Sequence, residues 1–276
     1  MKNKKRFLDL CVILVILFTL SCRDASNAST DKSSSLESPS SSSFNSIVKY
    51  LSGKVSLAQN SKFEEVPLSY TIRRRTRLHK RALKAFIKMA KAAKKENINL
   101  YVYSGTRNFW VQKSIWEAKF SGRRRVNNQN LAQKIKNRKE RALKILEYSS
   151  MPGTSRHHWG SDLDISFSKK NQSGMLVNNT YKPEGRGYKV YQWMVKNAFH
   201  YGFCQPYRSH PSERNQGYSL GYYEERWHWS YKPLALSNMK IYRKLLHYLR
   251  PKGFNGDDVA ASLYENFVFN VHQNCL

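Results

Sequence analysis

The chain has 276 residues, which is enough for one domain of ordinary size with additional tails. Hydrophobic residues make up 40% of it and aromatic residues 13%, so the composition can build a real core and excludes a wholly disordered chain. The formal net charge of +29 predicts attraction to a polyanion. Nucleic acid is the first candidate on charge alone, and the N-terminus argues against it.

The first residues have the features of an export signal. A positively charged start precedes residues 7–20, which are apolar apart from one aspartate and too short to span a membrane comfortably. Cys22 follows the small Ser21, as in a bacterial lipobox, although Thr19 stands where that pattern prefers Leu. We therefore predict a signal peptide over residues 1–21 with a lipid on Cys22. A simple cleaved signal or an uncleaved anchor is the alternative.

An exported basic protein meets the anionic cell wall or lipid headgroups rather than nucleic acid. We therefore expect a protein of the cell envelope, anchored through Cys22 and facing the periplasm or the exterior. Residues 22–46 are polar and rich in serine, so they predict a disordered tether. The folded domain is expected over residues 47–250, with its core at about 70–235, and a C-terminal extension over 251–276.

Hydrophobic periodicity places the first elements of this domain. Residues 76–95 carry an apolar stripe at helical spacing and predict a helix with a basic outer face. Residues 99–103 read as a strand, and residues 110–148 as mostly helical, with a break near 121–125. The arginines over 73–77 are expected to form a solvated face that could together bind wall phosphates.

The second half alternates loops with short elements. Residues 168–187 predict a polar loop, residues 188–200 a helix, and residues 201–203 and 221–229 strand segments. Residues 233–276 predict a tail that packs on the core as an extra helix. Cys204 and Cys275 leave two readings open, a disulfide outside the cytoplasm or two buried thiols.

Two short stretches carry the chemistry. Residues 155–165 contain His157 and Asp164, and residues 225–229 contain Glu225 and His228. Zinc catalysis needs three protein ligands, an open position for water and a separate carboxylate as base, and this inventory fits.

The residues around Asp164 alternate between apolar and polar. This alternation predicts a strand with Leu163 on the core face and Asp164 on the other. Asp162 lies two residues from Asp164 and is the rival ligand.

The pattern Ser-x-His-x-x-Gly-x-x-x-Asp followed by Glu-x-Trp-His resembles the VanY-type D-alanyl-D-alanine carboxypeptidases. These belong to the LAS metallopeptidases (lysostaphin, D-Ala-D-Ala peptidases, Sonic hedgehog). The resemblance implies an α+β fold: a single LAS/hedgehog-like domain, with helices around a small antiparallel sheet and a zinc site on that sheet. It also implies that one zinc ion is bound by His157, Asp164 and His228 and that Glu225 is the catalytic base.

Three further residues take a role from the same resemblance. Arg107, in the turn Ser-Gly-Thr-Arg after the expected strand, would stabilise the oxyanion. Ser155 and Gln112 would bind the substrate, with a turn hydroxyl and structural packing as their alternative roles.

The implied function is zinc-dependent removal of the terminal D-alanine from peptidoglycan stem peptides. An L,D-carboxypeptidase or a peptidoglycan endopeptidase on the same site is the first alternative, and the course of residues 168–187 would decide between a closed pocket and an open groove. A non-catalytic lipoprotein that binds the cell wall is the second alternative. A nucleic-acid binder rests on charge alone and conflicts with export.

Overall fold

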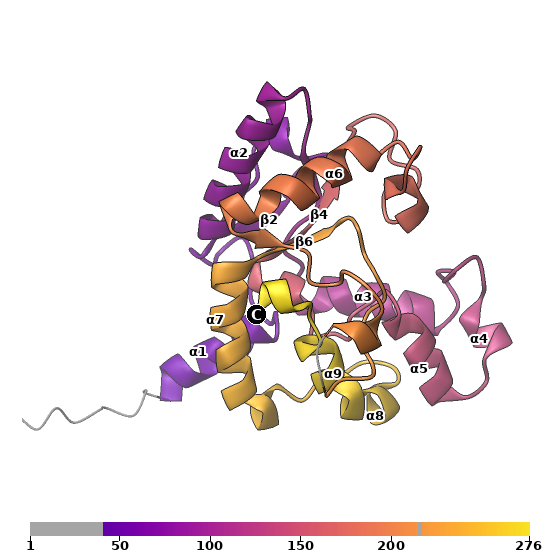
Figure 1. The fold of residues 1–276 in the computed structure, drawn as a ribbon. Helices are drawn as coiled ribbons and strands as arrows, with labels where there is room; N and C mark the ends of the chain where they lie inside the picture. The colour runs from indigo at the N-terminus through magenta and orange to yellow at the C-terminus, as the bar shows by residue number, and fades with distance from the viewer. Residues whose placement is uncertain (1–40, 215–216) are drawn as a thin grey trace, which may run out of the picture. The chain divides into compact units, whose positions relative to one another are not determined.

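The computed structural model describes residues 41–214 and 217–276, and it has the expected α+β architecture (Figure 1). Four strands form an antiparallel sheet in the order β3-β4-β6-β5, and two further strands pair as β1 and β2. The predicted signal peptide, the lipid site at Cys22 and most of the predicted tether lie outside the described residues. Within those residues, we find no helix with the length and the apolar character that a membrane crossing requires.

The sheet is small, and β4 lies between β3 and β6. The strands run β1 Phe63–Glu65, β2 Arg77–His79, β3 Tyr101–Ser104, β4 Asp162–Ser166, β5 Phe203–Cys204 and β6 His228–Tyr231. Because β4 pairs with both neighbours, Asp164 lies opposite Ser104 on one side and opposite His228 on the other. The register alone therefore brings two of the predicted site residues together.

The α-helices surround this sheet. They are α1 Ser41–Leu51, α2 Lys80–Lys95, α3 Phe109–Phe120, α4 Leu131–Lys134, α5 Arg138–Leu146, α6 Tyr188–Asn197, α7 Lys232–Lys244, α8 Asp257–Ala260 and α9 Tyr264–Phe269. Short 3₁₀ helices connect them at Leu68–Tyr70, Arg156–Trp159, Asn178–Tyr181, Ala198–Tyr201, Pro211–Glu213, Leu246–Leu249, Ala261–Leu263 and Gln273–Cys275.

Three boundaries differ most from the sequence expectation. The helix expected from residue 76 begins at Lys80, because residues 77–79 pair with β1 and the His79 ring caps the helix by accepting from Arg81 N–H. Helix α1 begins at Ser41, inside the range expected as a tether. The strand expected over residues 221–229 begins only at His228, since the backbone N–H groups of Tyr223 and Glu225 donate to the carbonyls of Glu147 and Tyr207 and not to a neighbouring strand.

Two apolar clusters hold the fold together. Helices α2 and α6 pack with Leu163 and Ile165 of β4 in one cluster. The other cluster contains residues of α1, α3, α5, α7 and α9. Figure 1 shows α2 and α6 on one side of the strands and α3, α5, α8 and α9 on the other. The predicted alternation is therefore correct: Leu163 lies in the core between the sheet and α2, and Asp164 points to the opposite face.

The C-terminal segment is part of the core. Phe267, Val268 and Phe269 of α9 are buried in the larger cluster, as expected for an extra helix packed on the domain. Of the two readings for the cysteines, the structure has the disulfide: Cys204 of β5 is bonded to Cys275. The bond closes a span of 71 residues, for which the loss of chain entropy in the unfolded state stabilises the fold by roughly 4 kcal/mol.

Candidate active site

Three elements deliver the predicted metal ligands to one place. His157 lies in the 3₁₀ helix Arg156–Trp159, Asp164 on β4 and His228 at the start of β6. Gly160 ends the 3₁₀ helix with a φ of 69°, and a Cβ there would lie 2.7 Å from the backbone nitrogen of His79. Only glycine meets both demands without strain, so it allows the sharp entry into β4 that the site requires.

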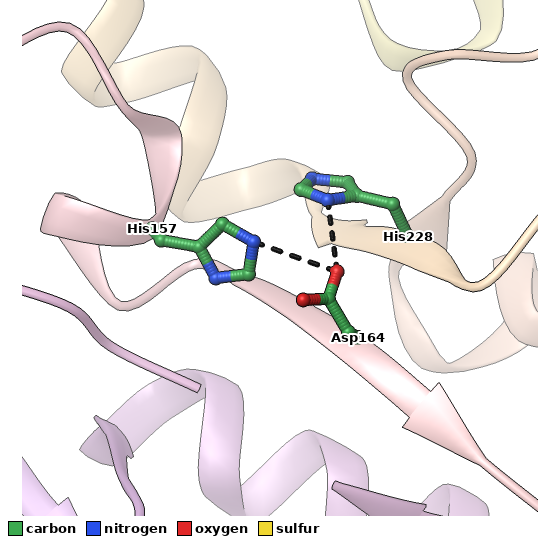
Figure 2. A group of neighbouring side chains, drawn as sticks. All are labelled: His157, Asp164 and His228. Atoms are coloured by element: carbon green, nitrogen blue, oxygen red, sulfur yellow. Dashed lines mark hydrogen bonds and ion pairs between the residues drawn. The ribbon is translucent and has the colours of Figure 1, made fainter. Parts of the chain in front are cut away.

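The three side chains converge on a common point (Figure 2). Asp164 Oδ1 lies 3.5 Å from His157 Nε2 and 3.1 Å from His228 Nδ1. All three candidate ligand atoms lie within 4.8 Å of one another, and the residues are buried. Ligand atoms of a tetrahedral zinc site are separated by roughly 3.3–3.5 Å, given bonds of about 2.1 Å. The group can therefore hold one metal ion with small adjustments.

One nitrogen of each histidine ring is occupied by a hydrogen bond, and the other faces the candidate metal position. His157 Nδ1 donates to the carbonyl of Gly105 at 2.8 Å, because that oxygen can only accept. His157 Nε2 is then a lone-pair nitrogen, and it has no hydrogen-bond partner within residues 41–214 and 217–276. His228 Nε2 donates to Asp162 Oδ2 at 2.9 Å, so its Nδ1 faces Asp164. Metal-binding histidines are commonly oriented in this way.

Asp162, the rival ligand, lies behind His228. Its carboxylate accepts from Arg156 Nε at 2.9 Å and from Ser230 Oγ at 2.7 Å, as well as from His228. Burial opposes ionisation of Asp162, but the charge of Arg156 and the bond from His228 outweigh it and hold the pKa of Asp162 well below its usual range. The residue therefore acts as an ionised anchor for the ring of His228.

Before a metal binds, the cluster contains an ionised Asp164 and a protonated His228, so a metal ion has to displace the proton on His228 Nδ1. Burial opposes ionisation of Asp164, but the charged ring of His228, which donates to it, holds the pKa of this carboxyl well below its usual range. Burial also opposes a charge on His228, yet the bonds to Asp162 and Asp164 raise its pKa to about 9. Burial and the charge of Arg107 lower the pKa of His157, which keeps that ring neutral.

Glu225 and Arg107 border this group. Glu225 Oε2 lies 3.3 Å from His228 Nδ1, and burial raises the pKa of Glu225 to about 7 against the opposing charge of His228. Arg107 follows β3, its Nη2 lies 4.0 Å from Asp164 Oδ2, and its backbone N–H donates to the carbonyl of His157. Both residues therefore flank the candidate metal position.

A cleft of about 310 Å³ opens over these residues. It is lined by Arg73, Tyr103, Ser104, Arg107, Val111, Ile115, Lys119, Arg124, Tyr148, Ser149, Ser150, His157, Asp164, Leu176, Tyr207, Tyr222, Glu225, Trp227 and His228. The predicted loop over residues 168–187 contributes Leu176 to one wall. Sequence reasoning missed Lys119 and the buried tyrosines Tyr207 and Tyr222. Their place in the cleft depends on tertiary packing, which residue spacing does not show.

The two predicted substrate-binding residues do not line the cleft. Gln112 is buried, and its Nε2 donates to the carbonyl of Ser150 at 2.7 Å. Ser155 is fully buried, and its hydroxyl has no hydrogen-bond partner in the part of the chain that the structure describes. Their contact with substrate stays a prediction. The hydrogen bond from Gln112 holds Ser150, which lines the cleft.

Known proteins resemble parts of this chain. The VanY family, described as D-alanyl-D-alanine carboxypeptidase, matches residues 75–234, which is more than half of the chain. An uncharacterized protein of Haemophilus influenzae (strain ATCC 51907 / DSM 11121 / KW20 / Rd) is 28% identical over 112 residues, which are 39% of this chain and 78% of that protein.

Solved structures show a distant likeness. A mutant of the vancomycin resistance D,D-pentapeptidase VanY from a VanB-type resistance cassette, in complex with Zn(II), has a TM-score of 0.44 and 23% identity, and the match covers 70% of this chain and 92% of that one. VanYB in complex with D-alanine-D-alanine has a TM-score of 0.44 and 21% identity, over 72% of this chain and 93% of that one. The family match spans both halves of the predicted motif, and the chain belongs to the VanY family of D-alanyl-D-alanine carboxypeptidases.

Proposed function

We propose that the protein hydrolyses the terminal D-Ala-D-Ala bond of peptidoglycan stem peptides with one zinc ion held by His157, Asp164 and His228. The observation that carries the proposal is the convergence of these three side chains beside Glu225. The carboxylate of Glu225 is buried and has a raised pKa. Family membership supports the substrate class.

The donor set favours zinc. Two imidazole nitrogens and one carboxylate oxygen are the ligand types of many catalytic zinc sites, in which a fourth position stays open. A bound zinc ion supplies a Lewis acid and lowers the pKa of a water molecule towards neutrality. The lone-pair nitrogen of His157 and the ionised Asp164 fit that ion as they are, whereas His228, with a pKa of about 9, gives up the proton on Nδ1 when the ion binds.

Glu225 is proposed as the general base. Its carboxylate accepts a proton from the attacking water while the oxygen of that water bonds to the carbonyl carbon of the substrate. The same carboxyl then gives the proton to the nitrogen of the leaving D-alanine as the C–N bond breaks. A pKa of about 7 suits both transfers, because a group that titrates near the working pH takes and returns a proton readily.

Arg107 is proposed to stabilise the negative charge that develops on the carbonyl oxygen. Its guanidinium is permanently charged, lines the cleft and lies next to Asp164 at the edge of the ligand group. A fixed donor placed where charge develops stabilises the transition state more than the ground state. The backbone hydrogen bond from Arg107 N–H to the carbonyl of His157 ties the position of Arg107 to that of the proposed ligand His157.

The anchor and the surface contacts belong to the same proposal. We infer that the signal over residues 1–21 exports the protein to the envelope, that Cys22 carries a lipid, and that residues 22–46 tether the domain. Helix α2 contains no acidic residue, and its cations are exposed: Lys80, Arg81, Lys84, Lys88, Lys91, Lys94 and Lys95. Such a face attracts an anionic cell wall or lipid surface.

Mass spectrometry of a muropeptide pentapeptide incubated with the purified protein tests the function. We expect the loss of one alanine, blocked by a zinc chelator and restored by added zinc. Release of the terminal residue only from tetrapeptides would favour an L,D-carboxypeptidase, and cleavage within the stem or a cross-bridge an endopeptidase. The absence of any cleavage by folded, zinc-loaded protein would contradict the enzymatic proposal and favour a wall-binding lipoprotein.

A further inference from the structure

The cleft contains a cation that the proposed mechanism does not use. Lys119 lies in the last turn of α3 and lines the cleft together with Glu225. Its ammonium group donates to the hydroxyl of Ser149. No carboxylate of residues 41–214 and 217–276 lies within 4.0 Å of this ammonium group, although ion pairs at that distance are found for several other cations, both half-buried and exposed.

The environment of Lys119 makes its charge costly. The side chain is half-buried, and burial lowers the pKa of Lys119 to about 8, with further contributions from Arg124 and Arg107. Glu225 acts in the opposite direction and raises the pKa of Lys119. The ammonium group loses hydration on burial, and its one hydrogen-bond partner is neutral, so the cost of desolvating the charge is not offset. An anion that enters the cleft would offset that cost.

The other cations of the cleft are placed differently. Arg107 lies beside Asp164, at the edge of the ligand group. Arg73 is exposed and stacks over the ring of Tyr103 at 4.7 Å from its centroid, and Arg124 is exposed at the rim. Among the cleft-lining cations of the described residues, Lys119 is thus the one that is neither exposed nor paired with a candidate metal ligand.

We propose that Lys119 binds the C-terminal carboxylate of the substrate and so restricts the enzyme to chain ends. The inference rests on the proposed function. In the leaving D-alanine one carbon joins the amine nitrogen to the carboxylate, so the residue that binds the carboxylate must lie near the residue that protonates the amine. Lys119 meets this requirement, because its side chain lines the same cleft of about 310 Å³ as the carboxylate of Glu225.

Two peptides test the role directly. Purified protein is given an acylated L-Lys-D-Ala-D-Ala with a free carboxylate and the same peptide as its C-terminal amide. A charge-assisted bond of this kind is expected to give a preference for the acid of about 10- to 100-fold in kcat/KM. In Lys119→Met the preference should fall towards one, through a higher KM for the acid, while the amide is hydrolysed as before.

A matched control lies on the same helix. Lys113 pairs with Glu117 and does not line the cleft, so Lys113→Met removes the same charge and should keep the preference for the acid. Lys119→Gln is the second variant, because its amide can still reach towards Ser149 while the charge is lost. It should behave as Lys119→Met does, even if the methionine variant folds poorly.

The outcomes separate the inference from the function. Equal hydrolysis of acid and amide by the wild type overturns the role of Lys119 and leaves the proposed peptidase intact. An equal loss on both peptides in the Lys119 variants means a structural role and overturns the inference as well. A zinc-loaded wild type that hydrolyses neither peptide, nor the muropeptide, overturns the proposed function and the inference with it.

Discussion

The two faces of β4 are both buried, but they are built differently. On one face Leu163 and Ile165 are 0% and 1% exposed and pack among apolar side chains of α2 and α6. On the other face Asp162 and Asp164 are 0% and 4% exposed and bind histidine, arginine and serine side chains. The apolar face gains stability from burial, whereas the polar face is tolerable only because its charges are paired. One strand thus separates the residues that hold the fold from those that carry the chemistry.

The largest effect is expected for a change on the polar side that leaves the ligands in place. Glu225→Gln keeps the shape of the side chain and removes the proton acceptor, so kcat should fall by about 10²- to 10⁴-fold. Zinc content should stay at one ion per chain, because Glu225 is not a proposed ligand. Release of D-alanine and metal analysis of the dialysed protein measure the two quantities. His228→Ala is the reference that should lose zinc, and a Glu225→Gln variant without zinc would show that Glu225 is a ligand.

A change on the apolar face should affect stability and spare the site. Leu163→Ala removes a fully buried side chain from the core next to α2 and should lower the free energy of unfolding by about 2–5 kcal/mol. Urea denaturation measures the loss, and kcat/KM should stay near the wild-type value where the variant is folded. If Leu163→Ala lost zinc with little change in stability, the two faces would not be separable.

The sequence predicted one property of β4 well and another not at all. The alternation from Leu163 to Ile165 shows that Leu163 and Asp164 lie on opposite faces, and the separation of two residues made Asp162 the rival ligand. It does not show that the polar face is buried, because that depends on Arg156, Ser230 and His228, which come from other elements. Residue spacing indicates candidate ligands but not the residues that orient them.

Other sequence predictions were wrong or incomplete for the same reason, because they depend on contacts between elements that lie far apart in the chain. The start of α2 was misplaced because pairing of residues 77–79 with β1 outweighs their helical pattern. Lys119 was not distinguished, since its burial and its place in the cleft arise from the position of α3 against residues 149–150. The disulfide could not be assigned, because two cysteines 71 positions apart meet only when the C-terminal segment packs beside β5. The two-part motif succeeded because it is short, local and chemically specific.

A smaller effect is expected for Asp162, which we propose orients His228, than for Asp164, which we propose binds zinc. Asp162→Asn keeps an oxygen that can accept from Arg156 but removes the negative charge that orients His228, so zinc affinity should fall by about 10- to 100-fold. Competition with a chromophoric chelator measures the affinity. Asp164→Asn should lose more, since it alters a proposed ligand. If Asp162→Ala lost zinc while Asp164→Ala kept it, the roles of the two aspartates would be reversed.

The smallest expected effect is a pH dependence that separates binding by Lys119 from a structural role. The pKa of Lys119 is lowered to about 8, so its ammonium loses its proton as the pH rises through that value. The preference for the acid over the amide in kcat/KM should then fall towards one above about pH 8, because this ratio reports the free enzyme and cancels effects common to both peptides. A ratio that stays constant from pH 6.5 to 9.5 would contradict the role.

Stability should change in the opposite direction over the same range. In the unfolded chain Lys119 keeps its proton up to its ordinary pKa of 10.5, so between about pH 8 and 10.5 the unfolded state binds more protons than the folded state. The free energy of unfolding of the wild type, relative to Lys119→Met, should therefore rise with pH while the preference for the acid falls. A residue that only tied α3 to Ser149 would alter stability and leave that preference unchanged, so the two trends measured together assign the role.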